Sequence, residues 1–171
     1  GEQDRGEQVL RASLAAAIVL QESYSVVHAQ LHLAAFLAAG TSTAKNSEAL
    51  RIVEQLLNGG ALNPSFRSWA LAISAEVHLS QGNADRSLAL ARESLDSAKM
   101  VPLRQLLARS VLILALLKQK QIACAQEEAV SAIGLLAHLG SAGYAAPAIL
   151  LAIVETLLQS GQRTQATELL R

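Results

Sequence analysis

Leucine and turn residues recur along the chain at intervals that separate long helical stretches. Four segments align, LAAG at 37–40, LSQG at 79–82, LKQK at 117–120 and LQSG at 158–161. Their last residues follow one another at intervals of 42, 38 and 41 residues. Three of these are Gly, which supplies the left-handed conformation that ends a helix, and the other is Lys120. The pattern predicts a repeat of about forty residues with this turn between two helices.

Small residues also recur after these turns. They follow the second, third and fourth turns and, after an insertion at 41–44, the first; in chain order they are Ala49, Ser87, Ala91, Ser94, Ala125, Ala129, Ala132 and Ala166. Small side chains on one helix face allow a neighbouring helix to approach closely. Each repeat is therefore predicted to be a hairpin of two packed helices.

Proline and glycine mark the remaining helix ends. Asn63-Pro64 has the form of an N-cap followed by proline at the first helical position, and Pro102 and Pro147 can open helices in the same way. Gly59-Gly60 and Gly140 are typical of helix C-termini. Together these signals predict nine helices, at 4–21, 23–39, 44–58, 64–81, 84–99, 102–119, 121–139, 143–160 and 162–171.

Composition supports an all-α protein and narrows its function. Apolar residues make up 51% of the 171 residues, and most are the helix formers Ala and Leu. The 14 basic and 14 acidic residues balance, which argues against disorder and against a basic nucleic-acid-binding protein. The uncharged stretches at 23–44 and 129–154 are interrupted by polar residues and Gly, so we expect no membrane span. The polar N-terminus and the lone Cys124 favour a cytoplasmic protein.

Paired helices with a Leu-x-x-Gly turn and small residues after it resemble the tetratricopeptide family. The resemblance covers 23–171 and is strongest at 69–100, around AEVHLSQGNADRSLALARESL. The period is longer than the usual ~34 residues, and the Trp-x-x-Leu-Gly opening is absent. Longer repeats look more like the MalT-type sensor arrays of bacterial signalling ATPases. The resemblance implies a right-handed α-solenoid of antiparallel hairpins over the single domain 1–171. A closed helical bundle or another kind of α-solenoid is the alternative.

Few residues are arranged for chemistry. His28 and His32 share a helix face, but no third metal ligand is near them in the sequence, so we interpret them as partly buried or groove-lining. Cys124 has no neighbouring base, so we expect it to be a small packed residue. The basic residues Arg104, Arg109, Lys118 and Lys120 are interpreted as a solvated face. No phosphate-binding loop or nucleophile motif occurs. We therefore expect no enzyme activity, no cofactor and no metal.

Aromatic residues lie in or beside the first helices of the predicted hairpins, at Tyr24, Phe36, Phe66, Trp69 and Tyr144. In tetratricopeptide-like arrays first helices line the concave surface. The resemblance implies that this surface includes Gln30, Ala34, Trp69, Ala72, Glu76, Ser110, Leu114, Leu151 and Glu155. The family's basic clamp for carboxy-terminal peptides has no counterpart at these positions. Each apolar position in the set fits either a groove or the core equally well.

These observations predict a non-enzymatic interaction or scaffold module that binds a peptide, helix or partner domain on a mostly apolar concave surface. The alternative is a ligand- or protein-sensing domain of a larger bacterial ATPase, kinase or transcriptional regulator. We expect neither nucleic acid nor membrane as a partner. The first predicted helix, apolar on nearly every side, and the short last helix indicate a segment of a longer array, or a homodimer formed through these ends.

Overall fold

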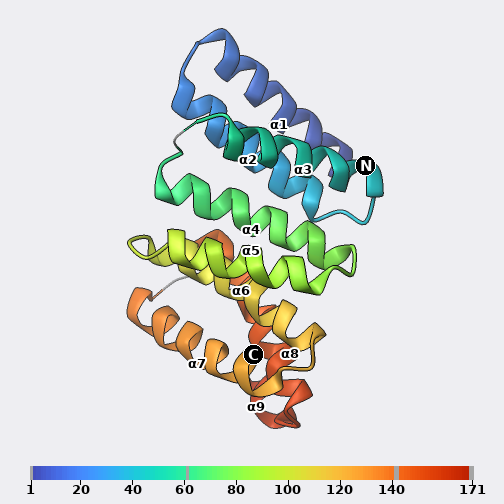
Figure 1. Ribbon diagram of the computed structural model, residues 1–171, viewed down its shortest axis with the longest axis vertical. Coiled ribbons are helices and arrows are strands. Elements are labelled where there is room, and N and C mark those ends of the chain that lie inside the picture. The colour runs from blue at the N-terminus through green and yellow to red at the C-terminus, as the bar shows by residue number, and fades with distance from the viewer. Residues whose placement is uncertain (1, 61, 141–142, 170–171) are drawn as a thin grey trace.

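The computed structural model describes residues 2–60, 62–140 and 143–169, and over these residues the protein is all-α (Figure 1). The described ranges contain nine α-helices and a short 3₁₀ turn, which follow one another: α1 (Glu2–Val19), α2 (Ser23–Ala38), α3 (Thr43–Asn58), α4 (Pro64–Ser80), α5 (Ala84–Ser97), α6 (Pro102–Lys118), α7 (Ile122–Leu139), η1 (Gly143–Ala145), α8 (Ala146–Gln159) and α9 (Arg163–Leu169). The predicted helices are confirmed, with ends displaced by at most three residues where both ends are described. Positions 170 and 171 of the last predicted helix lie outside the described residues.

The helices pack in chain order along the long axis of the molecule (Figure 1). Each helix contacts the next one, and α2, α4, α6 and α8 also contact one another in succession. In the described part of the chain, the backbones of α3, α5 and α7 approach only the helices that precede and follow them. The even-numbered helices therefore form a continuous row, with the odd-numbered helices packed along it. No helix in the described ranges is long and apolar enough to cross a membrane.

The hydrophobic core runs through the row of even-numbered helices. One cluster of buried side chains joins α2, α3 and α4 and includes Leu31, Leu37 and Ile73. The other joins α4 to α8 and includes Ile113 and Ile149. Helix α4 contributes to both clusters, so the core is continuous along the row.

Small residues at the predicted contact positions allow the close packing of the hairpins. Ser68 on α4 and Ser94 on α5 are buried, with their hydroxyl oxygens 3.1 Å apart, and Ser94 Oγ also donates to the carbonyl oxygen of Ser68 at 2.7 Å. The prediction is confirmed at all eight positions, because each is buried: Ala49, Ser87, Ala91, Ser94, Ala125, Ala129, Ala132 and Ala166. A larger side chain at any of them would push two helices apart.

Three of the four repeated turns share one hydrogen-bond pattern. The backbone N–H of Asn83 donates to His78, that of Gln121 to Leu116 and that of Gln162 to Leu157, at 2.9, 2.9 and 2.8 Å. This is the bond that closes a Schellman turn. The residue before each donor is left-handed, with φ of 82° at Gly82, 59° at Lys120 and 79° at Gly161.

Gly40 does not follow this pattern, so the left-handed conformation expected there is wrong. Gly40 is not among the described residues with a positive φ, and the N–H of Thr41 does not donate to Phe36, so no Schellman bond closes this turn. The connection between α2 and α3 runs over 39–42 and is one residue longer than those at 81–83, 119–121 and 160–162. The chain therefore reaches the N-cap Ser42, whose side chain accepts from the N–H of Lys45, without a left-handed residue at Gly40.

We expect Gly82→Val to destabilise the protein by about 1 kcal/mol or more, because a β-branched residue is strained at positive φ. An added Cβ at Gly82 meets nothing within 4 Å, so the cost is conformational and not a clash. Gly134→Ala is the control, since Gly134 lies inside α7 with open space around it and should gain about 0.5–1 kcal/mol in helix stability. Thermal unfolding followed by circular dichroism measures both. Equal melting temperatures for Gly82→Val and the unmodified protein would contradict the turn assignment.

Helix α1 is held to the rest of the array by packing on α2 and by ion pairs to α3. Arg11 pairs with Glu48 at 2.7 Å and with Glu7 at 2.9 Å, and Glu7 pairs with Lys45 at 2.8 Å. These contacts lower the pKa of Glu7 and Glu48 and raise that of Lys45. Apolar side chains remain exposed at Val9, Ile18 and Val19 of α1 and at Leu20, which follows it. A homodimer through this end stays a prediction.

Candidate binding surface

An aromatic cluster lies where the N-terminal halves of three even-numbered helices meet. It comprises Tyr24, His28 and His32 on α2, Phe66 and Trp69 on α4, and Arg104 on α6. Residues 24, 28 and 32 are spaced by four, so α2 presents them on one face. Asn63 caps α4 by accepting from the N–H of Phe66 at 2.9 Å, which fixes the start of the helix that carries Phe66 and Trp69.

The floor of the cluster is buried. Trp69 is 4% exposed and Phe66 is 6% exposed. The guanidinium carbon of Arg104 lies 3.9 Å from the centre of the Trp69 ring, in a cation–π arrangement, and Arg104 Nε donates to Ser65 Oγ at 3.3 Å. The charge of Arg104 is therefore held beneath the surface, against an aromatic face.

The upper layer of the cluster is open to solvent. Tyr24 is 67% exposed, and its ring lies 5.0 Å from that of Phe66 and stacks on His28 with an interplanar angle of 12°. His32 meets Trp69 edge to face at 4.7 Å and His28 at 4.5 Å. Tyr24, His28 and His32 also line a cleft of about 240 Å³ between α2 and α1. The cluster thus offers an accessible ring surface on a rigid, buried base.

Partial desolvation by the surrounding side chains lowers the pKa of His32, although its ring is exposed on one side, and the neighbouring His28 and Arg104 lower it further. At neutral pH the imidazole is therefore uncharged, with one nitrogen that donates and one that accepts. A carboxylate placed beside it would raise its pKa again, because the negative charge favours the protonated ring. In the described ranges no three His, Cys, Asp or Glu side chains gather as metal ligands would.

The residues predicted for the concave surface fall into three groups by the place of their side chains in the structure. Ala34, Ala72 and Ser110 are at most 2% exposed, and the Ser110 hydroxyl donates to the carbonyl oxygen of Leu107 at 2.7 Å. These side chains pack the even-numbered helices together. Trp69 forms the floor of the aromatic cluster. The others are half-buried or exposed and do not join the cluster: Gln30, Glu76, Leu114, Leu151 and Glu155.

The prediction of a solvated basic face on α6 is wrong for two of its members. Arg104 is 8% exposed and covers Trp69, and Arg109 is largely buried beside Glu128, with which it forms an ion pair. Lys118 and Lys120 are exposed. Burial of the two arginines is possible because an aromatic ring and a carboxylate replace part of their hydration.

The spacing from the aligned turns contains a signal for Arg104. Tyr24, Phe66 and Arg104 each stand sixteen residues before the turn residues Gly40, Gly82 and Lys120. The structure places all three in the first turns of α2, α4 and α6. The side chain of Tyr144, the remaining aromatic residue near a first helix, is outside the described residues.

Cys124 does not have the packed position expected for it, because its side chain is exposed at the start of α7. The small residue that packs there is its neighbour Ala125.

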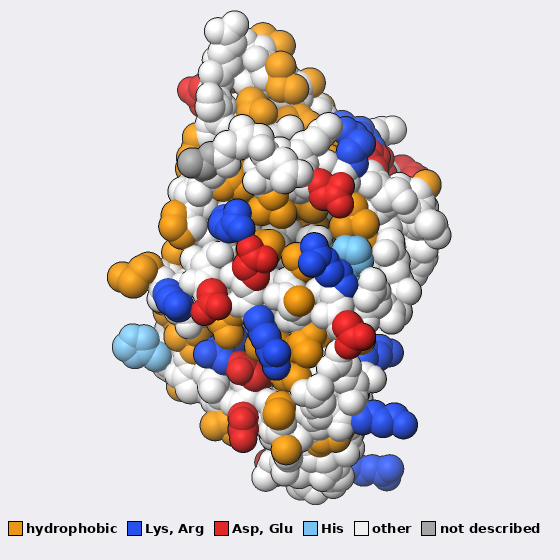
Figure 2. All heavy atoms as spheres, in the orientation of Figure 1, with side chains coloured by type: hydrophobic (Ala, Val, Ile, Leu, Met, Phe, Trp, Pro, Cys, Tyr) orange, Lys and Arg blue, Asp and Glu red, His pale blue; other side chains and the backbone are white. Residues whose placement is uncertain are grey.

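Acidic and basic side chains lie intermixed across the middle of the face shown in Figure 2, in keeping with the zero formal net charge.

Comparison with known proteins gives no match for this chain among protein-family models, curated proteins or solved structures.

Proposed function

We propose that this protein is a non-enzymatic interaction module that binds a peptide segment of a partner protein at the aromatic cluster. In this proposal the nine helices form a right-handed α-solenoid of hairpins, and the even-numbered helices line its binding face. The contacts between successive even-numbered helices support this arrangement. The aromatic cluster is the observation that carries the proposal, because an exposed Tyr24 and His32 stand on a buried, preorganised base.

The chemistry of the cluster favours a peptide that carries an aromatic side chain next to a carboxylate. Tyr24 offers a ring face for stacking, which adds about 0.5–1.5 kcal/mol beyond area burial. His28 and His32 offer N–H donors, and the buried guanidinium of Arg104 adds positive potential. The six residues of the cluster include no acid. An acidic and aromatic segment therefore complements both the shape and the charge of this surface.

The proposal predicts that a short peptide of sequence Glu-Phe-Glu, blocked at both ends, binds more tightly than its Lys-Phe-Lys counterpart. Trp69 is the one tryptophan of the sequence, so its fluorescence reports directly on the cluster. We expect Tyr24→Ser to weaken binding of the acidic peptide by about tenfold, since one stacking contact of ~1.4 kcal/mol corresponds to that factor. Val130→Ser is the control, because Val130 on α7 is 69% exposed and lies outside the cluster.

Affinity for the acidic peptide should also rise as the pH falls towards the lowered pKa of His32, since the protonated ring binds a carboxylate better. Equal binding of the two peptides, or equal loss in Tyr24→Ser and Val130→Ser, would overturn the proposal.

A further inference from the structure

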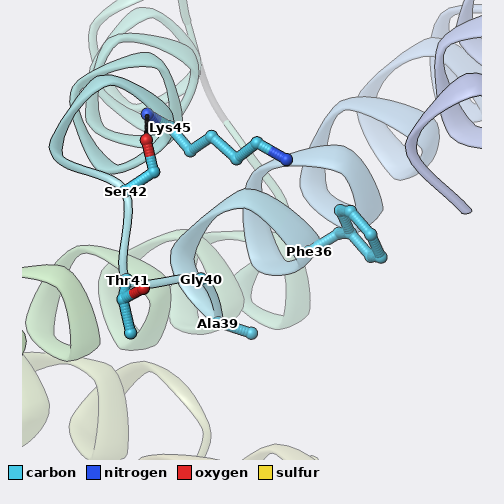
Figure 3. A pocket seen from close by; sticks show the side chains of 6 residues that line it. All are labelled: Phe36, Ala39, Gly40, Thr41, Ser42 and Lys45. Atoms are coloured by element: carbon cyan, nitrogen blue, oxygen red, sulfur yellow. Dashed lines mark hydrogen bonds between the residues drawn. The ribbon is translucent and has the colours of Figure 1, made fainter. Parts of the chain in front are cut away.

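A second, separate pocket lies at the other end of the even-numbered helices. It is formed by the C-terminal ends of α2 and α4 and the first turn of α3, and its volume is about 390 Å³. Its polar lining comes from Thr41, Thr43, Asn46, Glu76, Ser80 and Gln81. It adjoins the hollow in Figure 3 and shares residues 39–41 with it. Glu76 is two helical turns from Trp69 along α4, so the pocket is distinct from the aromatic cluster.

Asn46 lines this pocket and has a buried side-chain acceptor without a hydrogen-bond partner. Its side chain is 5% exposed, and its amide nitrogen donates to Ser80 Oγ at 3.3 Å. The Ser80 hydroxyl donates in turn to the carbonyl oxygen of Val77 at 2.8 Å, so Ser80 can only accept from Asn46. This fixes the orientation of the amide and leaves Asn46 Oδ1 buried without a hydrogen-bond partner. Buried acceptors are almost always paired, so this oxygen indicates a missing donor.

Glu76 brings a carboxylate into the same pocket. It is half-buried, and in the described part of the chain it has no ion pair or hydrogen bond. Burial alone raises its pKa, with no contribution from a charged neighbour. The ammonium group of Lys45, on the adjoining turn of α3, is bound by Glu7 at 2.8 Å. Figure 3 shows the Lys45 side chain extending away from Thr41 and towards the side of α2 that carries Phe36.

The backbone adds to the preference for a positive ligand. The pocket lies at the C-terminal ends of α2 and α4, where the partial negative charge of each helix dipole is located. The first turn of α3 brings the positive end of one dipole to the same pocket, and the side chain of the N-cap Ser42 partly offsets it by accepting from the N–H of Lys45. A carboxylate, an unpaired amide oxygen and two helix C-termini therefore converge on one cavity. All four favour a ligand that donates hydrogen bonds and carries positive charge.

We infer that the Glu76 pocket binds an alkylammonium group. Such a group has three N–H donors on one charged atom, which match Glu76, Asn46 Oδ1 and one hydroxyl oxygen of the lining. Ca²⁺ is usually held by several carboxylates among six to eight oxygen ligands at about 2.3–2.6 Å, whereas Glu76 is the one acidic residue of this lining. The ammonium group comes either from a free primary amine or from a lysine side chain of a partner protein. The inference does not depend on the aromatic cluster.

The test uses n-propylammonium chloride and isotope-labelled protein, with binding followed by NMR shifts of the Asn46 side-chain amide. We expect saturable binding that Glu76→Gln weakens by at least tenfold and Asn46→Ala by about threefold to tenfold. Glu155→Gln is the matched control, because Glu155 occupies the corresponding position on α8, six residues before Gly161 as Glu76 is before Gly82. It should bind as the unmodified protein does.

Three further probes separate the alternatives. Tetramethylammonium has the charge but no N–H donor, n-propanol has the shape but no charge, and neither should bind. Tighter binding of Nα-acetyl-lysine amide than of n-propylammonium assigns the site to a lysine side chain, and the reverse order assigns it to a free amine. Equal binding by Glu76→Gln, or saturation by tetramethylammonium or potassium chloride, would overturn the inference. Tyr24→Ser should leave ammonium binding unchanged, so this test and that of the proposed function can fail independently.

Discussion

Replacing Trp69 by alanine should destabilise the protein by about 3–5 kcal/mol, the range typical of a large aromatic side chain removed from a core. The indole is 4% exposed and contacts groups from two other helices, with His32 at 4.7 Å and the Arg104 guanidinium at 3.9 Å. Its loss leaves a cavity between α2, α4 and α6 and takes the aromatic face away from a buried positive charge. Both effects act against folding.

Circular dichroism during urea unfolding measures this loss, since the variant has no tryptophan to follow. Trp69→Phe is the matched control, because it keeps a ring under Arg104 and should lose less than half as much stability. A double-mutant cycle with Arg104→Met should give a coupling energy of about 0.5–2 kcal/mol between the two side chains. A loss below 1 kcal/mol for Trp69→Ala would show that the row of even-numbered helices does not depend on this contact.

The helices could be predicted because their signals are local. Asn63 and Pro64 start α4 by chemistry that acts within one turn, and Gly82 ends it in the same way. The small residues could be identified because the two helices of a hairpin approach each other closely at positions a fixed number of residues from the turn. The conformation of Gly40 was predicted wrongly although the Leu-x-x-Gly pattern is present, because the connection from α2 to α3 is one residue longer than the other three connections.

The candidate sites were harder to predict because they depend on contacts between helices that are distant in the sequence. The sequence predicts an exposed Arg104, because its contact with Trp69, 35 positions earlier in the chain, is visible only in the structure. The apolar positions Ala34 and Ala72 fitted a groove or a core equally well, and only packing shows that both are buried. Asn46 could not be predicted as a site residue. Nothing in the neighbouring sequence indicates that its amide nitrogen donates to Ser80 while its oxygen has no hydrogen-bond partner.

Glu76→Gln should stabilise the protein by about 1–2 kcal/mol at neutral pH, because it removes a half-buried charge that has no partner in the described chain. The sign of the pH dependence follows from the raised pKa of Glu76. Below pH 4.5, its ordinary value, the carboxyl is protonated in both folded and unfolded chains and costs nothing. As the pH rises above 4.5 the unfolded chain ionises first, so the folded state loses stability until the pH passes the raised pKa.

The difference in unfolding free energy between Glu76→Gln and the unmodified protein should therefore be near zero at pH 4 and reach its full value at neutral pH. Urea unfolding at a series of pH values measures it. His32, whose lowered pKa makes acid destabilising, is present in both proteins and cancels in the difference. Saturating n-propylammonium should reduce this difference in unfolding free energy, because a bound cation stabilises only the protein that carries the carboxylate. A difference in unfolding free energy that stays constant from pH 4 to pH 8 would mean that the charge of Glu76 does not cause the destabilisation.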